Sequence, residues 1–266
     1  MNTNPTFIER YELPIFLILT SLLSLAIPLF LTLPSEIVPL LVAIIPAIMA
    51  ILLIALTAGS KGVGSLLKKL FQWRVGLKWY LIALGMALIL RLTMSLLAFL
   101  LGWIPSIQLA KWGAAQYFLI GVFTVIGAIV EELGWRGYVL PKLLAHRSAL
   151  ASALIIGIPW GILHLSLIFP GQMNAGTSKL ATVLFTVALS IVLTWFFIRT
   201  GHGIVIGLIY HTLQNYFVFF NGGMTAAESL LLMTIVTATI AITLTLVYGP
   251  SLQPAPVKES TIVESG

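Results

Sequence analysis

The sequence has 266 residues, 59% hydrophobic and 8% charged, with a mean hydropathy of +1.09, which indicates an integral membrane protein because soluble domains carry about a quarter charged residues. The chain has no cysteine and its eight acidic residues are all glutamates, which excludes disulfides, thiolate metal ligands, cysteine nucleophiles and paired catalytic aspartates. The net charge of +6 comes from basic residues in short links between apolar runs, where anionic lipid binds them, so nucleic acid is not expected as a partner and the lipid bilayer is.

Eight apolar runs approach or exceed the roughly 20 residues with which an α-helix crosses a bilayer. Membrane-spanning strands alternate and stop near ten residues, so these runs favour helices. The predicted fold is an all-α polytopic membrane protein with about eight transmembrane helices, which enclose a cytoplasm-facing cavity inside the membrane. The seventh run is short and predicts a tilted or half-buried helix. The predicted spans are residues 13–33, 37–57, 79–101, 112 to about 140, 149–169, 180–198, 204–220 and 229–249.

Residues 1–249 are therefore expected to form a single transmembrane domain. The link 59–78 mixes lysines with leucines and a tryptophan, a pattern that fits either an amphipathic helix in the membrane interface or a solvated loop. Residues 250–266 contain three prolines and few large side chains, which predicts a disordered tail.

The basic residues indicate the orientation of the spans. Cytoplasmic links carry an excess of lysine and arginine, and placing link 59–78 in the cytoplasm puts 11 of the 14 basic residues on that side. Two others, Lys111 and Lys179, fall outside, and Arg91 lies within the third span. Both termini are then expected to face the cytoplasm, in a bacterial plasma membrane.

Glu131, Glu132 and Arg136 lie at the end of the fourth span, in the segment Glu-Glu-Leu-Gly-Trp-Arg. Ionisable groups inside a membrane are costly and usually functional. Glu132 and Arg136 are four residues apart on one helix face, in the favourable order for an ion pair, whereas Glu131 points about 100° away. We expect Glu132 to pair with Arg136, which leaves Glu131 free to act as a base.

Two further spans carry polar side chains one helical turn apart. Trp160 and His164 lie in the fifth span, and His211 and Asn215 in the seventh. At about 1.5 Å per residue from the cytoplasmic ends, Glu131 lies about 15 Å deep, His164 about 22 Å and His211 about 12 Å. Helix tilt absorbs such differences, so these groups are expected to meet in one cavity.

Two imidazoles, a free carboxylate and a carboxamide can hydrolyse a peptide bond without a covalent intermediate. The carboxylate removes a proton from water, one histidine orients this water, and an imidazole and an amide donate to the oxyanion. The residues His164, His211 and Glu131 are also candidate ligands of a zinc ion with an open position. Both schemes stay open. The sequence lacks the His-Glu-x-x-His and Gly-x-Ser-x-Gly motifs of other hydrolases.

These motifs together resemble the CPBP family of intramembrane proteases, also called the Abi family, which includes the type II CAAX prenyl endopeptidases. The family pattern is Glu-Glu-x-x-x-Arg, an aromatic residue with a histidine four later, and His-x-x-x-Asn. The resemblance covers about residues 112–220, the expected catalytic core. It implies an endopeptidase in which Glu131 and His164 activate water while His211 and Asn215 form the oxyanion hole. The family is often named as metalloproteases, although the glutamate mechanism needs no metal.

The resemblance implies a peptide or protein substrate that is prenylated or otherwise membrane-associated. A non-catalytic membrane protein for bacteriocin immunity or scaffolding is the alternative, and a transporter is a third reading. Arg91 lies near the middle of its span, too deep to reach either interface easily. It is expected either to face the cavity, pairing with a glutamate or receiving a substrate carboxylate, or to bond backbone carbonyls of neighbouring helices.

Overall fold

A computed structural model describes residues 6–31 and 33–254, and every regular element within these ranges is helical. Seven helical stretches are long and apolar enough to cross a membrane, which confirms the predicted all-α polytopic class. The elements are α1 (Phe7–Phe30), α2 (Val38–Lys68), η1 (Lys69–Phe71), α3 (Leu77–Leu100), α4 (Ala114–Glu132), η2 (Leu133–Val139), α5 (Leu140–Leu144), α6 (Ala149–His164), η3 (Leu165–Ile168), α7 (Lys179–Arg199), α8 (Val205–Tyr216), η4 (Phe217–Asn221) and α9 (Ala226–Tyr248).

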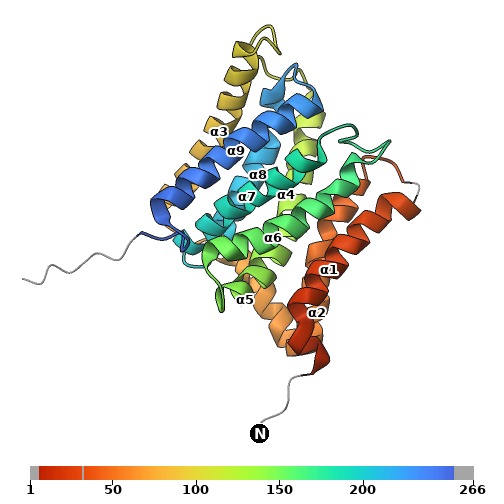
Figure 1. The fold of residues 1–266 in the computed structure, drawn as a ribbon, viewed down its shortest axis with the longest axis vertical. Coiled ribbons are helices and arrows are strands. Elements are labelled where there is room, and N and C mark those ends of the chain that lie inside the picture. Colours follow the sequence, from red (N-terminus) through yellow and green to blue (C-terminus); the bar gives the residue numbers. More distant parts are fainter. Residues whose placement is uncertain (1–5, 32, 255–266) are drawn as a thin grey trace, which may run out of the picture.

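The helices form one bundle in which α7 packs between α6 and α9 (Figure 1). Of the candidate spans, α7 has the largest buried share. The links that follow α1, α3 and α6 lie along the upper and right-hand edge of Figure 1, and those that follow α2, α5 and α7 lie along the lower and left-hand edge. Successive spans therefore alternate in direction, as a polytopic topology requires.

Helices α6 and α7 approach each other closely at two glycines one turn apart. A Cβ added to Gly157 would lie 2.6 Å from Val187 Cα, and one added to Gly161 would lie 2.6 Å from Thr186 Oγ1. The Thr186 hydroxyl donates to the Gly157 carbonyl at 3.1 Å. Small residues at such spacing let membrane helices pack backbone to backbone, which fixes the position of α6 in the bundle.

The observed elements differ from the predicted spans most clearly in α2 and in the fourth span. Helix α2 continues past residue 57 to Lys68, with non-helical dihedral angles at Gly59 (φ 61°), so the link 59–78 begins as a helix rather than as a loop. The predicted fourth span is divided into α4, a π-helical segment and α5. The seventh span is the 12-residue α8, short as predicted.

The predicted disorder of residues 250–266 is contradicted at the start of that segment. The Pro250 carbonyl accepts a hydrogen bond from Leu150 N at 2.9 Å, and Leu252 is fully buried. These contacts hold the chain after α9 against the start of α6. The rest of the predicted tail, residues 255–266, lies outside the described residues.

Candidate active site

The first predicted motif lies where α4 gives way to a π-helical segment. Glu131 and Glu132 are the last residues of α4, and η2 follows directly. Leu140 N donates to the Trp135 carbonyl, five residues earlier, which is the wide hydrogen-bond ring of a π-helix. Such segments are frequent at functional sites. The widened turn shifts the side chains that follow Glu132 out of α-helical register.

Two local features accompany this segment. Pro141 has no N–H to donate to the Gly137 carbonyl, and Lys69 Nζ donates to that carbonyl instead, at 2.6 Å. A Cβ added to Gly134 would lie 2.6 Å from Pro46 Cβ and 2.7 Å from the Pro46 carbonyl. The π-helical segment thus contacts both Lys69, in η1, and Pro46, in α2.

Glu131 lies between the two predicted histidines. Its Oε1 is 3.7 Å from His164 Nε2 and its Oε2 is 3.6 Å from His211 Nε2. Glu131 is 5% exposed and His211 is 3% exposed, whereas the side chain of His164 is 26% exposed. Three helices, α4, α6 and α8, therefore bring a carboxylate and two imidazoles together, with access from the His164 side.

The other ring nitrogen of each histidine has a fixed partner. His164 Nδ1 lies 2.9 Å from the Trp160 carbonyl oxygen, and His211 Nδ1 lies 3.0 Å from Glu132 Oε1. Carbonyl and carboxylate oxygens accept hydrogen bonds and do not donate them, so each Nδ1 carries a proton. In the neutral form of each ring, Nε2 then presents its lone pair toward Glu131.

Glu132 pairs with Arg136, as predicted, at 3.1 Å between Oε1 and Nη1. Both side chains are buried, at 0% and 1% exposure. The same Oε1 also accepts from His211 Nδ1, a contact between residues 79 positions apart that the spacing did not predict. The two adjacent carboxylates thus share His211 through its two ring nitrogens, whereas Arg136 pairs with Glu132 and His164 lies against Glu131.

Trp160 lies at the centre of this group. Its ring is edge-on to His211 and His164, with centroids 5.4 and 5.9 Å away, and the Arg136 guanidinium lies over it at 4.6 Å. An aromatic face attracts a cation at this distance. Trp160 therefore supports both histidines and covers the arginine, which explains the bulky aromatic residue one turn before His164.

Asn215 lies one turn after His211 on α8, so both project from the same helix face. Its Oδ1 accepts a hydrogen bond from Gln214 Nε2 at 2.6 Å. The structure thus joins Glu131, Glu132, Arg136, His164 and His211 by direct contacts. Asn215 belongs to the same group because it lies one turn after His211 on α8. The sequence did not predict a role for Gln214. The one feature that could have indicated such a role is its position next to Asn215.

Arg91 does not pair with a glutamate in the described residues, so that prediction was wrong. Its Nε donates to the Gln214 carbonyl at 2.8 Å, its Nη2 donates to the same oxygen, and its Nη1 donates to Asn221 Oδ1 at 3.1 Å. Helix α8 ends at Tyr216, and the last carbonyls of a helix lack intrahelical partners. Arg91 satisfies one of them, as the backbone-bonding alternative expected.

The three candidate zinc ligands, Glu131, His164 and His211, are of suitable chemical types, but their arrangement is not that of a metal site. Two lone-pair nitrogens and a carboxylate are suitable zinc ligands, but within residues 6–31 and 33–254 no group of three such side chains is arranged to hold a metal ion.

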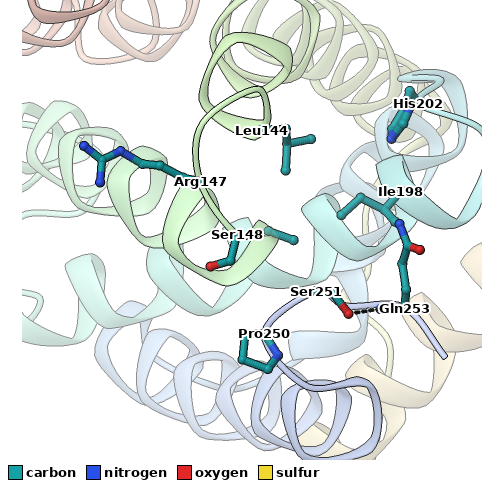
Figure 2. Close-up of a pocket in the computed structure, with 9 residues that line it drawn as sticks. Leu144, Arg147, Ser148, Ile198, His202, Pro250, Ser251 and Gln253 are labelled. Carbon is teal, nitrogen blue, oxygen red and sulfur yellow. Dashed lines mark hydrogen bonds between the residues drawn. The ribbon is translucent and has the colours of Figure 1, made fainter. Parts of the chain in front are cut away.

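Two surface pockets are lined by other residues. The larger, of about 590 Å³, lies where the α5–α6 link, the end of α7 and the chain after α9 meet (Figure 2). Arg147 points away from its centre in that view. The second, of about 380 Å³, is a groove along α4 and the end of α8, and it is lined by Tyr117, Phe118, Gly121, Val122, Val125, Ile126 and Tyr216.

Comparison with known proteins points to one family. Residues 112–217 match the sequence model described as type II CAAX prenyl endopeptidase Rce1-like. A curated protein of Methanococcus maripaludis, named CAAX prenyl protease 2, is 29% identical over 98 residues, which cover 34% of this chain and 36% of that protein. The chain thus aligns with about a third of its curated relative. The central segment of the chain, which contains all three motifs, is thus similar to the type II CAAX prenyl endopeptidases.

Proposed function

We propose that the protein is an intramembrane endopeptidase of the CAAX type, which hydrolyses a peptide bond with water activated by Glu131 and His164. One observation carries the proposal: the Glu131 carboxylate faces the Nε2 atoms of two buried or half-buried histidines on other helices. The comparisons support the reaction class because both matching descriptions name CAAX prenyl proteases.

The contacts supply a role for each group in the first step. A water molecule donates one hydrogen bond to Glu131 and the other to His164 Nε2, whose lone pair is available because Nδ1–H is bonded to Trp160. Glu131 takes the proton while the water oxygen attacks the carbonyl carbon of the substrate. The new C–O bond shifts an electron pair of the carbonyl to its oxygen.

His211 and Asn215 stabilise that oxyanion. In its charged form His211 donates through both nitrogens, to Glu132 from Nδ1 and to the oxyanion from Nε2. The Asn215 Nδ2 group donates the second hydrogen bond. Glu131 then returns its proton to the leaving nitrogen, and the C–N bond breaks to give a carboxylic acid and an amine.

The groove on α4 and α8 supports a substrate that bears a prenyl chain. It is apolar, opens on the outside of the bundle, and includes Tyr216, the residue after Asn215. A prenyl chain in this groove would hold the attached peptide beside the end of α8. A peptide with the chain is therefore expected to be cleaved with a lower KM than the same peptide without it.

The test is cleavage of a fluorogenic prenylated peptide by purified protein in detergent. We expect Glu131→Gln to lower kcat by about 10²- to 10⁴-fold, the usual contribution of a general base, with folding retained because the shape of the side chain is kept. Glu36→Gln, at an exposed glutamate, is the control and should leave kcat unchanged. Equal activity of the two variants would disprove the role of Glu131.

Two further experiments distinguish the proposed protease from a non-catalytic protein and the metal-free scheme from the metal-dependent one. Tight binding of the peptide without cleavage by the wild type would indicate the non-catalytic membrane protein. Loss of activity with a chelator, its recovery with zinc, and zinc bound to the wild type but not to a His164→Ala, His211→Ala variant would indicate the metal-dependent scheme.

A further inference from the structure

The end of α8 is held by a buried arginine from another helix. Arg91 on α3 is 1% exposed, and its Nε and Nη2 both donate to the Gln214 carbonyl. Its Nη1 donates to Asn221 Oδ1, and Asn221 Nδ2 donates to Ser229 Oγ at 2.5 Å. A cation at a helix C-terminus also interacts favourably with the helix dipole. The last turn of α8 is thus fixed to α3 and, through Asn221, to α9.

The side chain of Gln214 then determines which end of the Asn215 carboxamide is free. Gln214 is 1% exposed, and its Nε2 donates to Asn215 Oδ1 at 2.6 Å. An amide nitrogen can only donate, so this bond requires the Asn215 oxygen to face Gln214. The Asn215 Nδ2 group, with two hydrogens, is left for another acceptor.

We propose that Arg91 and Gln214 are positioning residues that make Asn215 present its nitrogen rather than its oxygen to the reacting carbonyl. The inference rests on the proposed function, in which Asn215 donates to the oxyanion. A flipped carboxamide would place a second oxygen against the developing negative charge. Arg91 fixes the backbone at Gln214, and the Gln214 side chain fixes the amide.

The central test is Gln214→Glu, which replaces the donor with a carboxylate that can only accept. Asn215 must then donate Nδ2 to the new carboxylate and turn its oxygen to the site. We expect kcat to fall by about 10²- to 10³-fold, the effect of losing one oxyanion donor, with KM changed less than threefold. Gln72→Glu, at an exposed glutamine, is the control and should be neutral.

Gln214→Met covers the case in which the buried carboxylate prevents folding. It keeps the length of the side chain and the carbonyl that Arg91 bonds, but frees Asn215 to adopt both orientations, so kcat should fall less than in Gln214→Glu. In an Asn215→Ala background, neither Gln214 variant should lower kcat further. Additive losses in this cycle would overturn the proposal, because a merely structural role would act independently of Asn215.

A spectroscopic arm separates this inference from the proposed function. In protein labelled with ¹⁵N-asparagine, the side-chain amide of Asn215, assigned with Asn215→Ala, should shift in Gln214→Met whether or not the wild type cleaves peptide. Arg91→Met should also shift it, by releasing the end of α8. An Asn215 amide unchanged in both variants would overturn the positioning role even if the wild type is an active protease.

Discussion

A single carboxylate oxygen, Glu132 Oε1, joins the first and third motifs. It accepts from Arg136 at 3.1 Å and from His211 at 3.0 Å, and Glu132 is fully buried. Moving a charge from water into the protein interior costs several kcal/mol, and only well-placed partners offset that cost. Because both partners depend on the same oxygen, the position of His211 is coupled to the ion pair on α4 and η2.

Glu132→Gln is expected to destabilise the protein, unlike Glu131→Gln. The substitution removes the negative charge and leaves the buried Arg136 cation without its counter-ion, which typically costs about 3–5 kcal/mol. Thermal unfolding in detergent should show a clearly lower Tm for Glu132→Gln and a Tm close to that of the wild type for Glu131→Gln. Indistinguishable melting curves would contradict the division of roles between the two glutamates.

The sequence was sufficient to predict the contact within one helix and the meeting of Glu131 with the two histidines. It was not sufficient to predict which atoms of the other helices pair with Glu132 and Arg91. The four-residue spacing of Glu132 and Arg136 determines their common face, and the structure confirms that pair. The bond of His211 to Glu132 and that of Arg91 to Gln214 join positions 79 and 123 residues apart. Such contacts depend on how each helix is rotated in the bundle, which the spacing of residues along the chain does not determine.

Among the elements, the π-helical segment η2 depends on one small residue. Gly134 leaves no room for a Cβ against Pro46 of α2. The sequence predicted one continuous span from residue 112 to about residue 140. Hydrophobic periodicity does not reveal a local change to wider turns, so the π-helical segment was not predicted. The packing of η2 against the Pro46 backbone became visible only in the structure.

Gly134→Ala is therefore expected to disturb the site from a position that carries no functional group. The added methyl group meets Pro46 backbone atoms, which cannot move aside as a flexible side chain can, and overpacking typically costs about 1–3 kcal/mol. Both Tm and kcat should fall.

Gly127→Ala, in the preceding helix α4, is the control, because a Cβ there meets nothing within 4 Å. This variant should match the wild type or be slightly more stable, since alanine favours helix more than glycine does. Equal Tm values for the two alanine variants would contradict the close packing at Gly134.

For the whole molecule, the long apolar runs were sufficient to predict seven spans, because length and hydropathy alone distinguish them. Helix α8 has only 12 residues, and its short run was recognised as unusual without revealing what holds its end. The side of the membrane on which each link lies remains a prediction from the basic residues.

Orientation can be tested by single-cysteine labelling, because the natural sequence contains no cysteine. Lys61 and Met173 are both exposed and lie in links expected on opposite sides. A membrane-impermeant maleimide should label Met173→Cys in intact bacterial cells, and Lys61→Cys only after permeabilisation, as the positive-inside rule requires. The wild type is the unlabelled control. Labelling of Lys61→Cys in intact cells would reverse the topology.

The bond between Arg91 and α8 also constrains how the chain is made. Helix α3 leaves the ribosome long before α8, since the two bonded residues are 123 positions apart. Until then the Arg91 guanidinium has no partner from α8, and an arginine at the centre of an inserting helix costs about 2.5–3.5 kcal/mol. Helix α8, about 18 Å long by its helical rise, is too short to cross the roughly 30 Å hydrocarbon core by itself. Helix α3 therefore carries a cation without this partner until α8 is made, and α8 depends on its contacts with α3 because it is too short to span alone.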